Sequence, residues 1–396
     1  MKRKEIILTN PERFSGNYEI PAEKVKDAIN RALKKLEGKI DIYTDGFPMT
    51  NTDTDEYGIG ENRNWVAGMH TGCFLLAYEL SADRRFLDVA EKHLPTYKSR
   101  IDNEIGMHDH DVGFAFSPSC VGMYKVMGNE AAKETALRAA NFLYDHSYME
   151  KGGFIIRICT SPDHPSHCRT MMDTLLNIPL FYWASEMTGD KKFVEAANAQ
   201  VKTTGDYLIR PDSSSYHHYQ FESGTLKPLH GLTFQGNRDE STWSRGHAWG
   251  VLGFPIAYTY NRDETLLELH KNVTYYFLNH LPEDLIPYWD FDFMDGDEPR
   301  DSSAAVIAVC GMLEAINYLP DTAPEKQVFK TAAAKILEAV IDKCSHETEY
   351  KFAGLIGHVT AAKPQGRGID TSALYGDYFY LEALMRYTNP EWKRYW

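Results

Sequence analysis

The chain has 396 residues, of which 43% are hydrophobic and 13% aromatic, enough for a large core. Its formal net charge of −14 argues against nucleic acid and against an anionic membrane surface as partners. It does not exclude a small anionic substrate, because a few arginines in a cleft can override the mean field.

Residues 1–20 are predicted to form an N-terminal extension. No apolar run of useful length precedes Pro11, so we expect no secretory signal and no membrane span. The cysteines are scattered without a CxxC pair, at Cys73, Cys120, Cys159, Cys168, Cys310 and Cys344. In a chain of this length they indicate free thiols and therefore a reducing, cytoplasmic location.

Charged amphipathic helices alternate with apolar ones along the rest of the chain. The charged helices are predicted at 22–37, 85–99, 131–148, 191–208, 263–280 and 324–343. The apolar helices are predicted at 65–80, 112–127, 171–188, 245–260, 302–318 and 370–387. Because the second set is apolar nearly all round, we expect it to be buried. The segments 151–158 and 216–234 have β-like patterns that fit hairpins.

Short turns join each apolar helix to the next charged one, as at Met127-Gly128-Asn129, where Gly suits a helix end and Asn a helix start. Longer segments connect each charged helix to the next apolar one. Six outer and six inner helices in strict alternation predict an all-α fold, an (α/α)6 barrel with short β-hairpins in the long loops. We expect one catalytic domain over residues 1–396. An open helical solenoid is the alternative, but the six units and the all-round apolar inner helices favour closure.

All inner helices of such a barrel run in the same direction, so their N-termini meet at one mouth. The residues predicted there are Trp65, Asp111, Asp173, Arg245, Asp301 and Asp370. N-capping alone would explain the aspartates. It would not explain Trp65, His110, Arg245 or Trp249.

Asp111 and Asp173 are the candidate catalytic residues. Both have apolar neighbours, where an ionised carboxylate is costly unless it is paired or neutralised. Two such carboxylates facing one cavity are the minimum for general acid/base chemistry on a sugar. Arg245 and Trp249 lie four apart on one helix face, an arrangement suited to a carboxylated sugar. An Arg–Trp pair that only stabilises the helix start is the alternative.

The run His108-Asp109-His110-Asp111 alternates possible metal ligands. Further candidates are His164, His167 and Cys168. No third and fourth ligand follow at a recognisable spacing, so we expect no metal and no cofactor.

These motifs together resemble the unsaturated glucuronyl hydrolases of glycoside hydrolase family 88. One matching motif is His110-Asp111-Val112-Gly113-Phe114. The other matching segments are 64–73, 173–178, 235–250, 288–290, 299–304, 368–370 and 375–384. The similarity therefore covers nearly the whole chain, in order.

The resemblance implies an (α/α)6 barrel that acts on disaccharides left by polysaccharide lyases, with a 4,5-unsaturated uronic acid at the non-reducing end. It implies that Asp173 is the general acid/base and Asp111 its essential partner. The implied uronate subsite consists of Trp65, His110, His217, Gly231, Thr233, Gln235, Arg245 and Trp249.

The implied reaction is hydration of a vinyl ether. Protonated Asp173 delivers a proton to C4, positive charge develops at C5 and the ring oxygen, and water adds at C5 as the carboxylate takes its proton. The hemiketal then opens and the glycosidic bond breaks. Apolar flanks and an ionised Asp111 would raise the pKa of Asp173, whereas a helix N-terminus would lower it. We therefore expect a mildly acidic optimum.

The chain departs from the family on the side of the leaving sugar. Family members often carry a tryptophan where this chain has Arg157-Ile158. Some also have two serines and a lysine that bind a sulfate; here the stretch 361–368 lacks the serines, and Arg367 could replace the lysine. Sulfate preference, leaving sugar and linkage stay open, and the sequence does not indicate an oligomeric state.

Three other functions are alternatives to the unsaturated glucuronyl hydrolase. An unsaturated rhamnogalacturonyl hydrolase would use the same barrel and chemistry on pectin fragments. A sugar 2-epimerase of the same barrel type would use histidines, such as His217 and His247, as its acid/base pair. A glycan-binding or scaffold barrel would use the aspartates only as N-caps.

Overall fold

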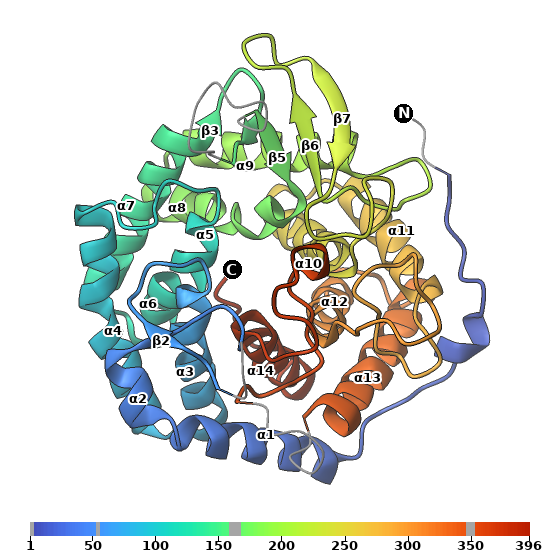
Figure 1. Cartoon of the computed structure of the whole chain (residues 1–396), viewed down its shortest axis with the longest axis horizontal. Coiled ribbons are helices and arrows are strands. Elements are labelled where there is room, and N and C mark those ends of the chain that lie inside the picture. The colour runs from blue at the N-terminus through green and yellow to red at the C-terminus, as the bar shows by residue number, and fades with distance from the viewer. Residues whose placement is uncertain (1–3, 53–55, 158–167, 346–352) are drawn as a thin grey trace.

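The computed structural model describes residues 4–52, 56–157, 168–345 and 353–396. Two concentric sets of helices form the (α/α)6 barrel predicted from the sequence (Figure 1). The outer helices are α1 (Ala22–Glu37), α4 (Arg84–Asp102), α7 (Glu130–Ser147), α9 (Lys191–Thr203), α11 (Thr265–Asn279) and α13 (Pro324–Cys344). Each lies within a few residues of its predicted range.

The inner set contains three uninterrupted predicted helices and two that are built from shorter pieces. The uninterrupted ones are α3 (Ala67–Ser81), α10 (Ser244–Asn261) and α12 (Ser302–Ala315). The predicted helix 112–127 consists of α5 (Val112–Phe116), a π-helical turn η2 (Ser117–Val121) and α6 (Gly122–Met127). The predicted helix 171–188 consists of a 3-10 helix η4 (Met172–Leu176) and α8 (Pro179–Thr188). The last inner helix is α14 (Leu374–Thr388).

Burial separates the two sets as the patterns predict. Every residue of α12 is buried, whereas α1 buries only Val25, Ala28, Ala32 and Leu36, along one stripe. The turns are also formed as predicted: Gly128 ends α6 at φ +67°, and the side chain of Asn129 accepts the backbone N–H of Ala132.

Two predicted inner-helix starts are wrong. Asp173 does not open an α-helix but lies inside η4, because Pro179 has no N–H to continue a helix and takes the first turn of α8 instead. Asp370 lies four residues before α14, at φ +55°, and its exposed side chain bonds to His358 Nδ1 at 2.7 Å. Asp370 is therefore not at the mouth as a helix cap.

Short strands lie in the loops at the mouth of the barrel. The predicted hairpin in 216–234 is β6 (His218–Phe221) with β7 (Pro228–Leu232). In the predicted segment 151–158 lies β4 (Phe154–Ile155), whose partner β3 (Tyr148–Met149) precedes that segment. β5 (Arg169–Met171) pairs antiparallel to β6, with Met171 opposite His218, and completes a three-stranded sheet. Since η4 follows β5 directly, this sheet fixes the start of the segment that carries Asp173. β1 (Phe47–Pro48) and β2 (Ile59–Gly60) form a further, unpredicted pair.

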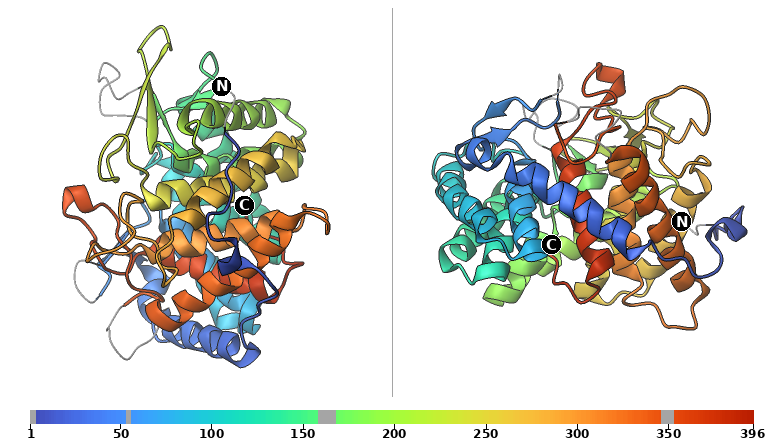
Figure 2. Two further views of the ribbon diagram at one scale, coloured as in Figure 1. Left: turned by 90° about the vertical axis from the view of Figure 1, so that its right-hand side faces the viewer. Right: turned by 90° about the horizontal axis from the view of Figure 1, so that it is seen from below.

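The remaining short helices lie in connections: η1 (Pro11–Phe14), α2 (Ile40–Asp45), the π-helical η5 (Thr204–Leu208) and η6 (Lys363–Gln365). The N-terminal segment runs along the outside of the barrel, across the α11 and α13 side (Figure 2). Thr9 N–H donates to Asn279, and Lys335 Nζ donates to the carbonyl of Arg13 at 2.7 Å. Residues 4–20 are thus tied to the outer helices.

Among the described residues, no helix combines the length and the apolar character that crossing a bilayer requires. The described cysteines are buried free thiols: Cys73, Cys120, Cys168, Cys310 and Cys344. Cys159 lies outside the described residues. The cytoplasmic location stays a prediction.

Candidate active site

A cavity of about 450 Å³ opens at the end of the barrel where the inner helices begin. This volume lies within the range of small-molecule sites. The predicted site residues that line it are Trp65, His110, Asp111, Asp173, Gln235, Arg245, Trp249 and Arg367. Residues up to 302 positions apart in the sequence therefore meet at one place, as the barrel topology predicts.

The two candidate catalytic carboxyls lie beside the same imidazole nitrogen, which forms a hydrogen bond with Asp173 and an ion-pair contact with Asp111. His110 Nε2 lies 3.2 Å from Asp173 Oδ1 and 3.3 Å from Asp111 Oδ1. Asp111 occupies the N-cap position of α5, but its side chain makes no capping hydrogen bond. N-capping therefore does not account for Asp111.

Close backbone packing holds these two carboxyls together. A Cβ on Gly113 would lie 2.2 Å from the carbonyl oxygen of Asn177, so only glycine allows α5 to approach η4 this closely. The Asn177 side chain accepts the backbone N–H of Phe114 at 2.8 Å, and its Nδ2 donates to the Asp173 carbonyl at 3.3 Å. Asn177 thus joins the two segments that carry Asp111 and Asp173.

Burial and neighbouring charges set the ionisation of this cluster. Burial raises the pKa of Asp111 to about 7, and the charges of Asp109 and Asp173 act in the same direction. Burial opposes a charge on His110, but the carboxylates of Asp111, Asp109 and Asp173 raise the pKa of this imidazole well above its usual value. The raised pKa expected for Asp173 stays a prediction.

Arg245 is less free than the sequence suggests. Its Nη1 pairs with the buried carboxylate of Asp301 and donates to the Thr360 carbonyl, and its Nη2 donates to the Ala361 carbonyl. The guanidinium therefore does not present an empty fork to the cavity. Its charge stays at the wall, and its donors hold the loop around 360–361 in place.

Aromatic rings form the sides and floor of the cavity. Trp65 stacks on Tyr375, with ring centroids 5.3 Å apart and an interplanar angle of 17°. The Arg245 guanidinium lies 4.6 Å from the Tyr375 centroid and 4.5 Å from that of Trp243, on a continuous stack. Trp249 is 1% exposed and packs below, against Phe114. These rings are suited to the apolar faces of a sugar.

The loop that follows β7 closes another side. Gln235 Nε2 donates to the Ala361 carbonyl at 2.8 Å, so this loop and the 361–367 loop support each other. Arg367 is exposed at the rim. Arg157, at the end of the described part of the β4 loop, lines the cavity beside Asp109.

Three predicted subsite residues do not line the cavity. His217 is buried, and its Nδ1 accepts the backbone N–H of Phe234 and contacts Thr233 Oγ1 at 3.4 Å. A Cβ on Gly231 would lie 2.2 Å from the Tyr216 ring. His217, Gly231 and Thr233 thus shape the β6–β7 hairpin beside the site. The His217 ring also packs on Trp243 of the cavity wall, with ring centroids 4.5 Å apart.

Two parts of the wall are not predicted from the sequence. The segment 49–51 reaches the cavity through a β-bridge between Asn51 and Ala373, a contact over more than 300 positions. Tyr375 lies in the first turn of α14, beyond the Asp370 at which that helix was predicted to begin. A prediction that began α14 at Leu374 would have placed Tyr375 at the mouth of the barrel, near the predicted position of Trp249 in α10.

Comparison with known proteins agrees with this geometry. The model of Glycosyl Hydrolase Family 88 matches residues 38–387. This chain belongs to glycosyl hydrolase family 88. It is 38% identical over 390 residues to the unsaturated chondroitin disaccharide hydrolase of Streptococcus agalactiae, covering 98% of this chain and 97% of the relative.

Solved structures of family 88 proteins agree over the full length. A crystal structure of unsaturated glucuronyl hydrolase from S. agalactiae superposes with a TM-score of 0.96 at 38% identity, covering 100% of this chain and 99% of the other. An aspartate-to-asparagine variant of that enzyme, complexed with dGlcA-GalNAc6S, superposes with a TM-score of 0.89 at 35% identity and the same coverage. The barrel and its helix order are therefore those of the family.

Membership of family 88 and the position of His247 both count against the epimerase alternative. His247 is fully buried, with Nδ1 3.0 Å from Ser215 Oγ and Nε2 2.8 Å from the Val273 carbonyl. Since neither ring nitrogen faces the cavity, His247 cannot exchange a proton with a sugar there.

The candidate metal ligands do not form a single cluster in the structure. Asp109, His110 and Asp111 lie close enough to offer one ligand atom each within 4.8 Å of one another. Both ring nitrogens of His110 are already engaged by carboxylates. Cys168 is buried among Phe154 and Phe221, away from this cluster. His164 and His167 lie outside the described residues, and the expectation of no metal stays a prediction.

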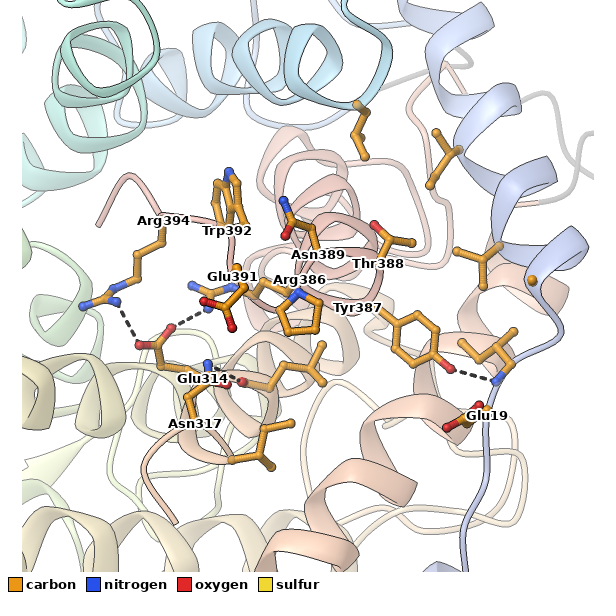
Figure 3. A pocket seen from close by; sticks show the side chains of 18 of the residues that line it. Glu19, Glu314, Asn317, Arg386, Tyr387, Thr388, Asn389, Glu391, Trp392 and Arg394 are labelled. Carbon is orange, nitrogen blue, oxygen red and sulfur yellow. Dashed lines mark hydrogen bonds and ion pairs between the residues drawn. The ribbon is translucent and has the colours of Figure 1, made fainter. Parts of the chain in front are cut away.

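A larger cavity, of about 1100 Å³, lies at the opposite end of the family 88 barrel, where the inner helices end (Figure 3). Its charged floor is already paired: Glu314 forms ion pairs with Arg386 and with Arg394. It contains none of the predicted catalytic residues. Size alone therefore does not locate the active site in this fold.

Proposed function

We propose that this chain releases the 4,5-unsaturated uronic acid from the non-reducing end of lyase-generated, glycosaminoglycan-type disaccharides. The observation that carries the proposal is the pair of carboxyls, Asp111 and Asp173, that share His110 Nε2 inside an aromatic cavity. Such a pair can keep one proton near neutral pH while its other member is ionised.

We assign the general acid/base role to Asp173 and the partner role to Asp111. Asp173 delivers a proton to C4 of the vinyl ether, and positive charge develops at C5 and the ring oxygen. The carboxylate that results takes a proton from the water that adds at C5. Burial raises the pKa of Asp111 to about 7, so the partner carboxyl can hold a proton beside Asp173 near neutral pH.

The walls suit an unsaturated uronate with an anionic second sugar. Trp65 and Tyr375 offer a flat stacked surface, and the charge of Arg245 lies next to it. Arg157 and Arg367 add positive charge at the cavity wall and rim. In an acidic protein, this local positive charge supports a small anionic oligosaccharide as substrate rather than a nucleic acid or a membrane.

The glucuronyl branch is favoured over the rhamnogalacturonyl branch by the relatives, which act on unsaturated chondroitin disaccharides according to their names. The test is turnover of unsaturated chondroitin disaccharides, followed by the loss of ultraviolet absorbance of the conjugated double bond. The matched substrate is the same disaccharide with the 4,5-bond saturated. We expect turnover of the first and none of the second, because hydration needs the vinyl ether; equal hydrolysis of both would contradict this mechanism.

A further inference from the structure

A third carboxylate, Asp109, contacts the back of the His110 ring. Its Oδ1 accepts a hydrogen bond from His110 Nδ1 and a second from the His110 backbone N–H, at 2.7 Å. The proposed reaction gives Asp109 no role. Its contacts nevertheless fix both the position and the tilt of the imidazole.

The opposite edge of the ring faces the reacting carboxyls. His110 Nε2 lies 3.2 Å from Asp173 Oδ1 and 3.3 Å from Asp111 Oδ1, and the side chain is 3% exposed. A ring that is held by a carboxylate at Nδ1 has a fixed orientation at Nε2. Asp109 therefore determines where the Nε2–H points.

The charges around the ring favour a doubly protonated imidazole. The groups that face His110 are Asp109, Asp111 and Asp173, while the Arg157 charge acts on Asp109 and Asp111. Burial favours the neutral acid of Asp109, but the charge and hydrogen bond of His110 hold its pKa at about 2. Asp109 is thus the member of the cluster that stays ionised.

We propose that Asp109 is a positioning residue that acts through His110: it keeps the imidazole doubly protonated, so that Nε2–H points to Asp173 while the ring charge lies next to Asp111. This arrangement lets one of the two carboxyls ionise while the other holds a proton. The consequence for turnover rests on the proposed function; the state of the ring does not.

The first test measures the ring without substrate. NMR titration of the His110 imidazole in the full chain should show a cation at neutral pH in the wild type. In Asp109→Asn, which keeps an acceptor but removes the charge, the titration should move down by about one pH unit or more. The matched control is Glu104→Gln, since Glu104 makes a similar contact to His108, with Oε2 2.7 Å from Nε2, on the exposed part of the same loop.

The second test asks whether Asp109 acts through His110. Asp109→Asn should lower kcat about tenfold with little change in KM, as is typical when the partner of a functional histidine is removed. In a His110→Gln background, the same substitution should cause no further loss. Glu104→Gln should leave kcat unchanged. Asp109→Glu, which restores the charge, should recover the titration of the ring in part.

The proposal is overturned if Asp109→Asn leaves the His110 titration unchanged, or if it lowers kcat equally in both backgrounds. The same holds if wild-type His110 is neutral at neutral pH, a result that needs no variant to fold. If the wild type does not turn over unsaturated disaccharides, the proposed function fails and the titration alone decides the role of Asp109.

Discussion

Arg245 of α10 forms an ion pair with Asp301, which precedes α12, and their side chains are 2% and 0% exposed. These two residues join neighbouring inner helices directly beneath the cavity. Asp301, which N-capping alone could have explained, is the counter-ion of the buried guanidinium of Arg245.

Removing the negative charge of Asp301 should destabilise the barrel. Asp301→Asn leaves the Arg245 charge buried without its counter-ion, which should lower the free energy of unfolding by about 3 kcal/mol. Denaturant unfolding measures this. The control is Asp370→Asn, whose exposed pair with His358 should contribute less than about 1 kcal/mol; equal losses would contradict the assignment.

The contact between α5 and η4 should be intolerant of a single methyl group. In Gly113→Ala, the added Cβ meets the backbone of Asn177 at 2.2 Å, so Asp111 must move away from Asp173. We expect a loss of about 1–3 kcal/mol in stability and a fall in kcat of about a hundredfold, as for a displacement near 1 Å.

Gly128→Ala is the matched control for this substitution. Gly128 is at a positive φ, unlike Gly113, but nothing lies within 4 Å of the added Cβ, and the position is at the far end of the barrel. The substitution should cost about 1 kcal/mol and leave kcat unchanged. Loss of activity in both variants would show that general destabilisation, rather than the α5–η4 contact, is responsible.

Activity should fall as the pH rises through about 7, the pKa to which burial raises Asp111. The folded protein keeps this proton, whereas an unfolded aspartate releases it near about pH 4. The active pair needs the proton, so kcat should be high below pH 7 and decline above it. The stability contributed by Asp111 should decline as the pH rises from about 4 to about 7, because the folded state binds one more proton than the unfolded state in that window. A kcat that rises from mildly acid to alkaline pH would contradict this.

Arg367 should affect sulfated substrates selectively. It is exposed, so Arg367→Ala should raise KM for a sulfated unsaturated disaccharide only a few-fold, about 0.2–1 kcal/mol, and less at high salt. The unsulfated disaccharide is the internal control and should change little. An equal rise in KM for both would indicate that Arg367 does not contact the sulfate.

Local patterns predict most of the fold because helix periodicity and capping are local properties. The α1 stripe and the Gly128-Asn129 turn are examples. The break at Pro179 also has a local signal, which the apolar run around it obscured. The early start given to α14 came from extending its apolar pattern back to Asp370, where the backbone is at positive φ.

The sequence predicts which residues line the site better than it predicts the contacts between them. The barrel topology brings Asp111, Asp173 and Arg245 to one mouth, and the sequence predicts this. The pairing of Arg245 with Asp301 and the sharing of His110 between two carboxyls depend on packing between segments 56–63 positions apart. No local pattern encodes such contacts, so the ion pair that occupies Arg245 was not predicted.

Asp173 is the residue that we propose as the general acid/base in hydration of the unsaturated uronate. The most direct measurement is the decay of ultraviolet absorbance of an unsaturated chondroitin disaccharide with wild type and with Asp173→Asn, after circular dichroism and thermal unfolding have shown that both are folded. Because a carboxamide can neither protonate C4 nor take a proton from water, we expect decay with the wild type and a loss of at least about a hundredfold in the variant. Wild-type turnover in a folded Asp173→Asn protein would contradict the account.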